Sequence, residues 1–220
     1  MHIVYINPNS TASMTDAVVC AAREAAPDLA VTGLTNVAGP PAIEGPEDGA
    51  AAVPGVMALL PEARAQGADA IVIACFDDTG LDQVRAAAGC PVLGIGQSAF
   101  VMAGLLGVRW SVVTSLAVSV PVIRGNIEAL GLGANCVSVR ASGLPVLTID
   151  EGSDATRAHL AAEFRRARAE DGAQAVVLGC AGMAALRRNL ADRSNMLLID
   201  GVQASIFLAR AAAGFVTAAA

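Results

Sequence analysis

Two similar apolar segments of this chain each end in a cysteine. Residues 67–75 read GADAIVIAC and residues 172–180 read GAQAVVLGC, so Cys75 and Cys180 hold matching positions. A thiolate can remove a proton and a thiol can return one. Two cysteines that face each other across one substrate could therefore take a proton from one face of a carbon and replace it on the other. A disulfide between them is the competing chemistry, but it would block proton transfer.

Both cysteines are expected at the end of a strand and just ahead of a helix. The free N–H groups and the positive dipole end of a helix stabilise a thiolate, so we expect a lowered pKa at both thiols. The same N–H groups could stabilise a developing enolate oxygen. Simple burial is the competing interpretation, since free cysteines are often buried, but the repeated phrase favours a function. Core packing is expected for the remaining cysteines, Cys20, Cys90 and Cys136.

Polar turns follow the two strands that open the halves of the chain. Asn7-Pro8-Asn9-Ser10-Thr11 ends the first strand, and Thr114-Ser115 ends its counterpart. We expect both turns to line the same cleft as the cysteines and to hydrogen-bond a small polar substrate. Asn, Ser and Thr are also common helix caps and turn formers, and both roles are compatible at these positions.

The other titratable residues have more ordinary interpretations. Asp77 and Asp78 are expected to cap the helix that follows Cys75. His2 and His159 lie far apart in the sequence and are expected to face solvent, so the sequence predicts no metal site. The glycines near residue 95 do not form a dinucleotide-binding fingerprint.

Short β-branched runs alternate with alanine-rich helical stretches, which is typical of βα units around a parallel sheet. The first half is expected to contain strands at 2–7, 29–35, 70–75 and 91–96, and helices at 13–26, 51–66, 81–88 and 98–106. The second half is expected to repeat this order, with strands at 110–114, 135–141, 175–180 and 196–200, and helices at 118–130, 153–170, 183–190 and 202–213. Ser153 is expected to cap the long helix, and residues 142–152 to form a loop.

The repetition spans the whole chain and predicts an α/β fold of two similar lobes. Each lobe is expected to be a parallel sheet flanked by helices, and a pseudo-two-fold axis relates the two. We assign residues 1–97 with 202–220 to the first lobe and residues 98–201 to the second. Ligands of open α/β sheets bind beyond the carboxyl ends of the strands, so the active site is expected in the cleft between the lobes.

Composition excludes several classes of function. All fourteen basic residues are arginine, so no lysine is present to form a Schiff base. A net charge of −6 without a basic run argues against nucleic acid as a partner. The apolar stretches are shorter than the roughly 20 residues of a membrane helix, and we recognise no signal peptide. Together with an odd number of cysteines, these features favour a soluble cytoplasmic protein without a membrane partner.

Five segments carry a resemblance to a known family. They are INPNST (Ile6–Thr11), ACFDDTGLDQVR (Ala74–Arg85), SVVTSLAVSVPVI (Ser111–Ile123), RASGLPVL (Arg140–Leu147) and LGCAGMA (Leu178–Ala184). In this order they resemble the aspartate/glutamate/hydantoin racemase superfamily, and within it the hydantoin racemases. The resemblance covers nearly the whole chain.

The resemblance implies a racemase that needs no cofactor and uses Cys75 and Cys180 as acid and base. It also implies a homo-oligomer that acts on a small hydantoin-like ring. The substrate-binding turns of the family correspond here to Asn7, Asn9, Phe76, Thr114, Ser115, Ala181 and Gly182.

The sequence departs from the hydantoin racemases in two turns. They often read Cys-Phe-Gly-Asp-Pro-Gly, whereas Asp77 and Thr79 replace the glycine and the proline here. A carboxylate so close would raise the pKa of Cys75 and could reshape the pocket for the ring. The turn after Thr114 often carries a second threonine and then an arginine, and Ser115 and Val118 stand there instead.

The resulting interpretation is a racemase of 5-monosubstituted hydantoins, in which Cys75 serves one face of the ring carbon and Cys180 the other. Allantoin racemase, the same reaction on a ureido-substituted ring, is the nearest alternative, and a polar pocket around Asp77 would favour it. An amino-acid racemase would need more charged groups, and an arylmalonate-type decarboxylase keeps only one catalytic cysteine. A two-lobed binding module with inert, buried thiols is the non-enzymatic alternative, which iodoacetamide labelling would identify.

Overall fold

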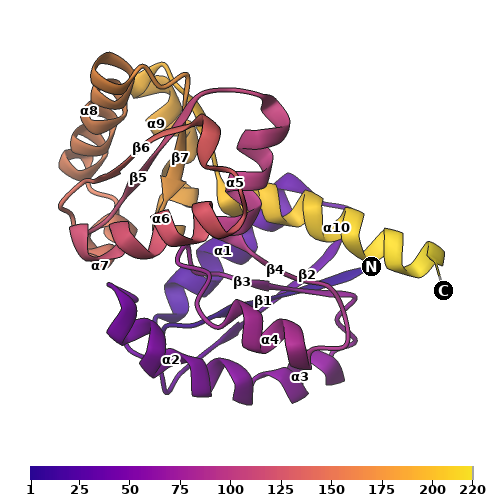
Figure 1. Cartoon of the computed structure of the whole chain (residues 1–220). Helices are drawn as coiled ribbons and strands as arrows, with labels where there is room; N and C mark the ends of the chain where they lie inside the picture. The colour runs from indigo at the N-terminus through magenta and orange to yellow at the C-terminus, as the bar shows by residue number, and fades with distance from the viewer. Residues whose placement is uncertain (220) are drawn as a thin grey trace.

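The chain folds into two α/β lobes that repeat one topology. A computed structural model describes residues 1–219, and its first sheet has the strand order β2-β1-β3-β4. The second sheet has the order β6-β5-β7-β8, which is the same arrangement one repeat later. All strand pairs in both sheets are parallel. The predicted duplication and the α/β fold class are therefore confirmed (Figure 1).

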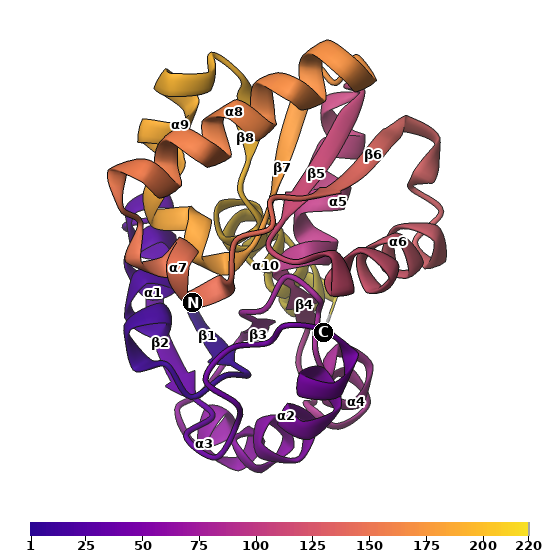
Figure 2. The same ribbon diagram turned by 90° about the vertical axis from the view of Figure 1, so that its left-hand side faces the viewer.

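The strands are short and mostly buried. In the first sheet they are β1 (His2–Asn7), β2 (Ala30–Thr35), β3 (Ala70–Ile73) and β4 (Val92–Gly94). In the second they are β5 (Trp110–Thr114), β6 (Cys136–Ala141), β7 (Ala175–Gly179) and β8 (Leu197–Ile199). The inner strands read as continuous apolar runs because helices cover both faces of a parallel sheet. Both sheets end, at their carboxyl edges, toward the boundary between the lobes (Figure 2).

The helices alternate with these strands. The first lobe contains α1 (Ala12–Ala25), α2 (Pro46–Ala58), α3 (Leu60–Ala65) and α4 (Leu81–Ala87), and α5 (Ile95–Leu106) leads out of it. The second contains the 3₁₀ turns η1 (Ala117–Ser119), η2 (Gly133–Asn135) and η3 (Ala181–Leu186), with α6 (Val120–Ala129), α7 (Val146–Glu151), α8 (Asp154–Asp171) and α9 (Arg187–Ser194). The last helix is α10 (Gly201–Ala219).

Three predicted segments differ from the structure. The helix expected at 51–66 is two helices that meet at Leu59, because Pro61 lacks an N–H and cannot continue the hydrogen bonds of α2. The loop expected at 142–152 contains the short helix α7. The helix expected at 183–190 begins as the 3₁₀ turn η3 and becomes α-helical only at Arg187. The predicted cap is confirmed, since Ser153 Oγ accepts the N–H of Thr156 at 3.1 Å.

Helix α10 returns from the second sheet to the first. It contacts α5, β3 and β4, and in Figure 1 it runs out from between the lobes. Tyr5 Oη and Ser205 Oγ, 2.9 Å apart and both buried, connect it to β1. α10 has the length and hydropathy of a membrane span, and a third of its apolar window is buried in the fold. Our assignment of 202–220 to the first lobe remains a proposal, and Ala220 lies outside the described residues.

One buried cluster joins the lobes. It combines Ile3 and Tyr5 of β1 with Val113 of β5, Leu178 of β7 and Cys180 itself. A core that is shared between both sheets holds the carboxyl ends of their strands at a fixed separation. The fold therefore positions the ends of β3 and β7, which lead into the two cysteines, around one point.

Candidate active site

Both cysteines line one hollow between the lobes. Its walls are Asn9, Met14, Ile43, Ala74, Cys75, Phe76, Asp77, Thr114, Ser115, Ser119, Val146, Gly179, Cys180 and Ala181. The space open to a water-sized sphere is about 30 Å³, enough for about two or three water molecules, since one needs roughly 10–15 Å³ of such space. The walls must therefore move apart before a five-membered ring can enter.

Cys75 follows β3 and stands at the start of a tight turn. Its sulfur accepts the hydroxyl of Thr79 at 3.5 Å and the backbone N–H of Asp77. Burial, followed by the negative charge of Asp77, raises the pKa of the Cys75 thiol well above its ordinary value. The two hydrogen bonds oppose that shift without reversing it.

Cys180 holds the same position after β7 in the second lobe. Its side chain is only 7% exposed, and its sulfur accepts the backbone N–H of Gly182. Burial raises the pKa of the Cys180 thiol to about 12, and the charge of Asp77 adds to the shift. Each sulfur thus receives an N–H from the residue two positions further along, a correspondence that follows from the duplication.

The expectation of a lowered thiol pKa is wrong for this structure. Helix α4 begins only at Leu81, six positions beyond Cys75, so its N-terminus does not adjoin the thiol. The turn η3 begins directly after Cys180 but is a short 3₁₀ segment. Desolvation inside a packed interface consequently outweighs the backbone donors.

Most of the predicted binding residues lie together. Asn9, Phe76, Thr114, Ser115 and Ala181 join the two cysteines in lining the hollow. They come from both lobes, as the predicted cleft requires.

Two of the predicted binding residues do not line the hollow. The amide of Asn7 donates to Asn9 Oδ1 at 2.9 Å and to Thr15 Oγ1 at 3.0 Å, so it orients Asn9 instead. Gly182 stands behind Cys180, where its N–H contacts the sulfur and an added Cβ would lie 3.3 Å from the backbone of Asp150. Both therefore act on the site through a neighbour.

Asp77 faces the hollow and does not act as a helix cap. Its Oδ2 accepts the hydroxyl of Ser119 at 3.3 Å, and its backbone oxygen accepts the amide of Asn126 at 3.1 Å. Both donors belong to the second lobe, so Asp77 reaches across the boundary. Burial raises the pKa of Asp77 to about 6, which leaves the group ionised at neutral pH.

Asp78 caps a helix, but not the one that the sequence suggested. Its carboxylate oxygens accept the N–H groups of Gly96 at 2.9 Å and Gln97 at 2.7 Å, at the start of α5. The cap position of α4 is Gly80 instead. Asp78 therefore ties the turn after Cys75 to the helix that connects the lobes.

Sequence reasoning missed six residues of the hollow, and two of them, Ala74 and Gly179, immediately precede the cysteines. Met14, Ile43, Ser119 and Val146 line it from α1, a loop, η1 and α7. Ile43 lies in the loop after β2 and Val146 begins α7 after β6, so their equivalent positions in the repeat could have indicated them. Ser119 lies in the segment SVVTSLAVSVPVI that carries the family resemblance, whereas nothing in the sequence near Met14 pointed to a site.

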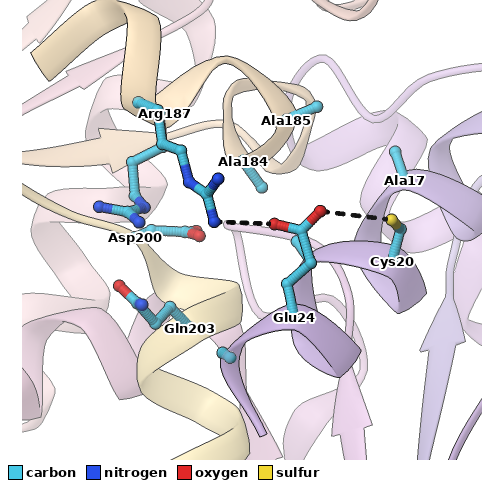
Figure 3. Close-up of a pocket in the computed structure, with 11 residues that line it drawn as sticks. Ala17, Cys20, Glu24, Ala184, Ala185, Arg187, Asp200 and Gln203 are labelled. Carbon is cyan, nitrogen blue, oxygen red and sulfur yellow. Dashed lines mark hydrogen bonds and ion pairs between the residues drawn. The ribbon is translucent and has the colours of Figure 1, made fainter. Parts of the chain in front are cut away.

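A larger hollow lies outside the thiol site. It has a volume of about 340 Å³ and is walled by α1, η3, α9 and the start of α10 (Figure 3). Arg188 pairs with Glu24 across it at 3.4 Å. Cys20 lines it and is exposed, so the prediction that Cys20 packs in the core is wrong. Charged residues already pair with one another there, and neither candidate catalytic thiol reaches it.

The remaining cysteines and histidines lie away from the thiol site. Cys90 and Cys136 are half-buried. His2 is half-buried and not free in solvent, because its ring contacts Thr32 Oγ1 at 2.9 Å. His159 is exposed, as predicted.

Several known proteins with similar sequences or structures are racemases. The model of the Asp/Glu/Hydantoin racemase family matches residues 3–209. A hydantoin racemase from Rhizobium meliloti is 43% identical over 97% of this chain and 89% of its own length. An allantoin racemase from Klebsiella pneumoniae superposes with a TM-score of 0.90 at 37% identity, over 96% of this chain and 86% of that one. The allantoin racemase from Pseudomonas fluorescens gives 0.88 at 32% identity, over 96% and 90%.

Proposed function

The chain belongs to the Asp/Glu/hydantoin racemase family, and on that basis we propose that it interconverts the enantiomers of 5-monosubstituted hydantoins. It is an isomerase of the racemase type. The observation that supports the assignment of Cys75 and Cys180 as its acid and base is that thiols from opposite lobes line the same hollow.

The ring carbon C5 lies between a carbonyl and a nitrogen and carries the proton to be exchanged. The thiolate of one cysteine takes this proton and becomes a thiol, and the C–H electrons pass into the adjacent carbonyl as an enolate. The thiol of the other cysteine then protonates C5 from the opposite face and becomes a thiolate. The roles of Cys75 and Cys180 reverse for the opposite enantiomer.

The polar walls suit a ring with amide groups. Asn9, Thr114 and Ser115 offer amide and hydroxyl groups of both donor and acceptor type. Phe76 and Ala181 supply apolar contacts next to the two sulfurs. No arginine lines the hollow among the described residues, which fits a neutral substrate better than an amino acid.

We extend the proposal to the state of the protein. It acts without a cofactor, as a cytoplasmic homo-oligomer that binds neither nucleic acid nor membrane. The net charge of −6 supports the absence of a nucleic-acid partner. Exposed Phe207, Phe215 and Val216 on α10, with Leu105 on α5, supply apolar surface for contact between subunits.

Racemisation of allantoin is the second candidate. The carboxylate of Asp77 in the hollow and the likeness to the allantoin racemase from Klebsiella pneumoniae favour it. The reaction at C5 would be identical, and only the substituent would differ.

Proton NMR in D₂O, combined with polarimetry, tests the proposal. One enantiomer of 5-benzylhydantoin is expected to lose its C5–H signal while its optical rotation decays to zero, faster than in buffer alone. Racemisation should fall by about 10²- to 10⁴-fold in both Cys75→Ser and Cys180→Ser. If neither 5-benzylhydantoin nor allantoin reacts faster than in buffer, the hydantoin assignment is wrong.

A further inference from the structure

Asp77 is the only carboxylate among the described residues that line the thiol hollow. We propose that Asp77 selects hydantoins whose 5-substituent carries N–H donors, such as a ureido or carbamoyl group, over hydantoins with a hydrocarbon substituent. This inference rests on the proposed racemase function and specifies the substrate class of the same site.

The carboxylate of Asp77 has unused capacity to accept hydrogen bonds. An ionised carboxylate has about four acceptor positions. Among the described residues, the only side-chain donor to it is Ser119, at the long distance of 3.3 Å. Asp78 differs, since backbone N–H groups satisfy both of its oxygens. Asp77 can therefore accept hydrogen bonds from N–H groups of a substrate, whereas the oxygens of Asp78 already accept backbone N–H groups of α5.

The charge of Asp77 affects the reaction as well as binding. It raises the pKa of both Cys75 and Cys180, so it acts on both sides of the reacting carbon. An unpartnered carboxylate there disfavours the thiolate and the enolate that the reaction requires. A substituent with N–H groups can donate hydrogen bonds to the carboxylate and offset its negative charge. A hydrocarbon substituent displaces water from the carboxylate without providing a replacement hydrogen bond.

A purely structural role makes a different prediction. Asp77 also connects the lobes, because Ser119 and Asn126 of the second lobe donate to it. If this connection were its whole contribution, its loss would impair every substrate by the same factor. Discrimination between substrates is therefore the property to measure.

The test compares two substrates of similar size in three proteins. Allantoin carries a ureido group, and 5-isobutylhydantoin carries a hydrocarbon chain. The kcat/KM for C5–H exchange in D₂O is measured for the wild type, for Asp77→Asn, and for Asn126→Ala. The last variant removes one hydrogen bond between the lobes and keeps the carboxylate.

The wild type is expected to prefer allantoin. Asp77→Asn should lower kcat/KM for allantoin about 10- to 100-fold, the usual range for a hydrogen bond to a charged group. It should raise kcat/KM for 5-isobutylhydantoin, because the charge that raises the pKa of both thiols is removed. Asn126→Ala should change both substrates by the same factor. An equal loss on both substrates in Asp77→Asn, at an unchanged melting temperature, overturns the inference. A wild type that exchanges neither substrate refutes the proposed function, and the inference with it.

Discussion

Replacing one cysteine should uncouple proton exchange from racemisation. In Cys180→Ser the hydroxyl can still accept the N–H of Gly182, and the side chain keeps nearly the same volume in a site that is 7% exposed. A hydroxyl is a far weaker acid than a thiol, so proton transfer at that face is lost. General acid–base catalysis contributes about 10²- to 10⁴-fold, and racemisation should fall by that factor, or roughly 3–5 kcal/mol in activation free energy.

The remaining thiol should still act on its own face of the ring. Cys75 can remove a proton from one enantiomer and return a deuteron to the same face, which exchanges the C5–H without inversion. Cys180→Ser is therefore expected to exchange one enantiomer of 5-benzylhydantoin in D₂O, and Cys75→Ser the other. Proton NMR on each pure enantiomer, with chiral chromatography of the product, measures both events. Exchange of the same enantiomer by both variants, or racemisation within tenfold of the wild type, would refute the reasoning.

Three further predictions follow from the described contacts. Burial raises the pKa of both thiols, and the thiolate is the form that removes the proton. The value of kcat/KM should therefore rise with pH by up to about tenfold per pH unit, without a plateau below pH 9. A pH–rate profile that levels off at pH 7 would contradict this. Ser153→Ala removes the cap of α8 and should cost about 1 kcal/mol, or about 2–4 °C in Tm by circular dichroism; an unchanged Tm would show that the cap contributes nothing. Gly179→Ala places a Cβ 2.6 Å from the carbonyl oxygen of Val113. This close contact should lower the free energy of unfolding by about 1–3 kcal/mol and impair racemisation. Gly125→Ala is the control, because its added Cβ meets no atom of the described residues within 4 Å apart from its chain neighbours and the backbone of its own helix, and it should leave the free energy of unfolding in urea undiminished.

The fold could be predicted because local patterns and global topology agree. The segments that end at Cys75 and Cys180 each encode a buried strand and the turn that follows it. Because this unit occurs twice, the sheet built around it is expected to occur twice as well. The structure confirms the equivalence of β3 and β7 in their sheets. The break between α2 and α3 at Leu59 could not be predicted from the apolar periodicity. The apolar spacing continues through Pro61, whereas the helical hydrogen bonding does not.

The site could be predicted only in part, because its electrostatics depend on tertiary packing. A lowered thiol pKa follows from a strand–helix junction considered alone, but burial in the folded chain raises the pKa of both thiols instead. Asp78 forms its hydrogen bonds 18 and 19 positions away, at α5, a distance at which sequence spacing carries no signal. The position of Asp77 across from Ser119 likewise depends on how the lobes meet.

The two thiols have unequal surroundings, and thermodynamics limits how this inequality can appear. Cys75 is half-buried and accepts a hydroxyl, whereas Cys180 is buried and accepts only a backbone N–H in the hydrogen bonds described. Mirror-image substrates have equal free energies in water, so their equilibrium constant is one for any enzyme. The Haldane relation then requires equal kcat/KM in the two directions. The inequality between the thiols can therefore appear only in kcat and KM separately, and the enantiomer that has the lower KM must turn over proportionally more slowly.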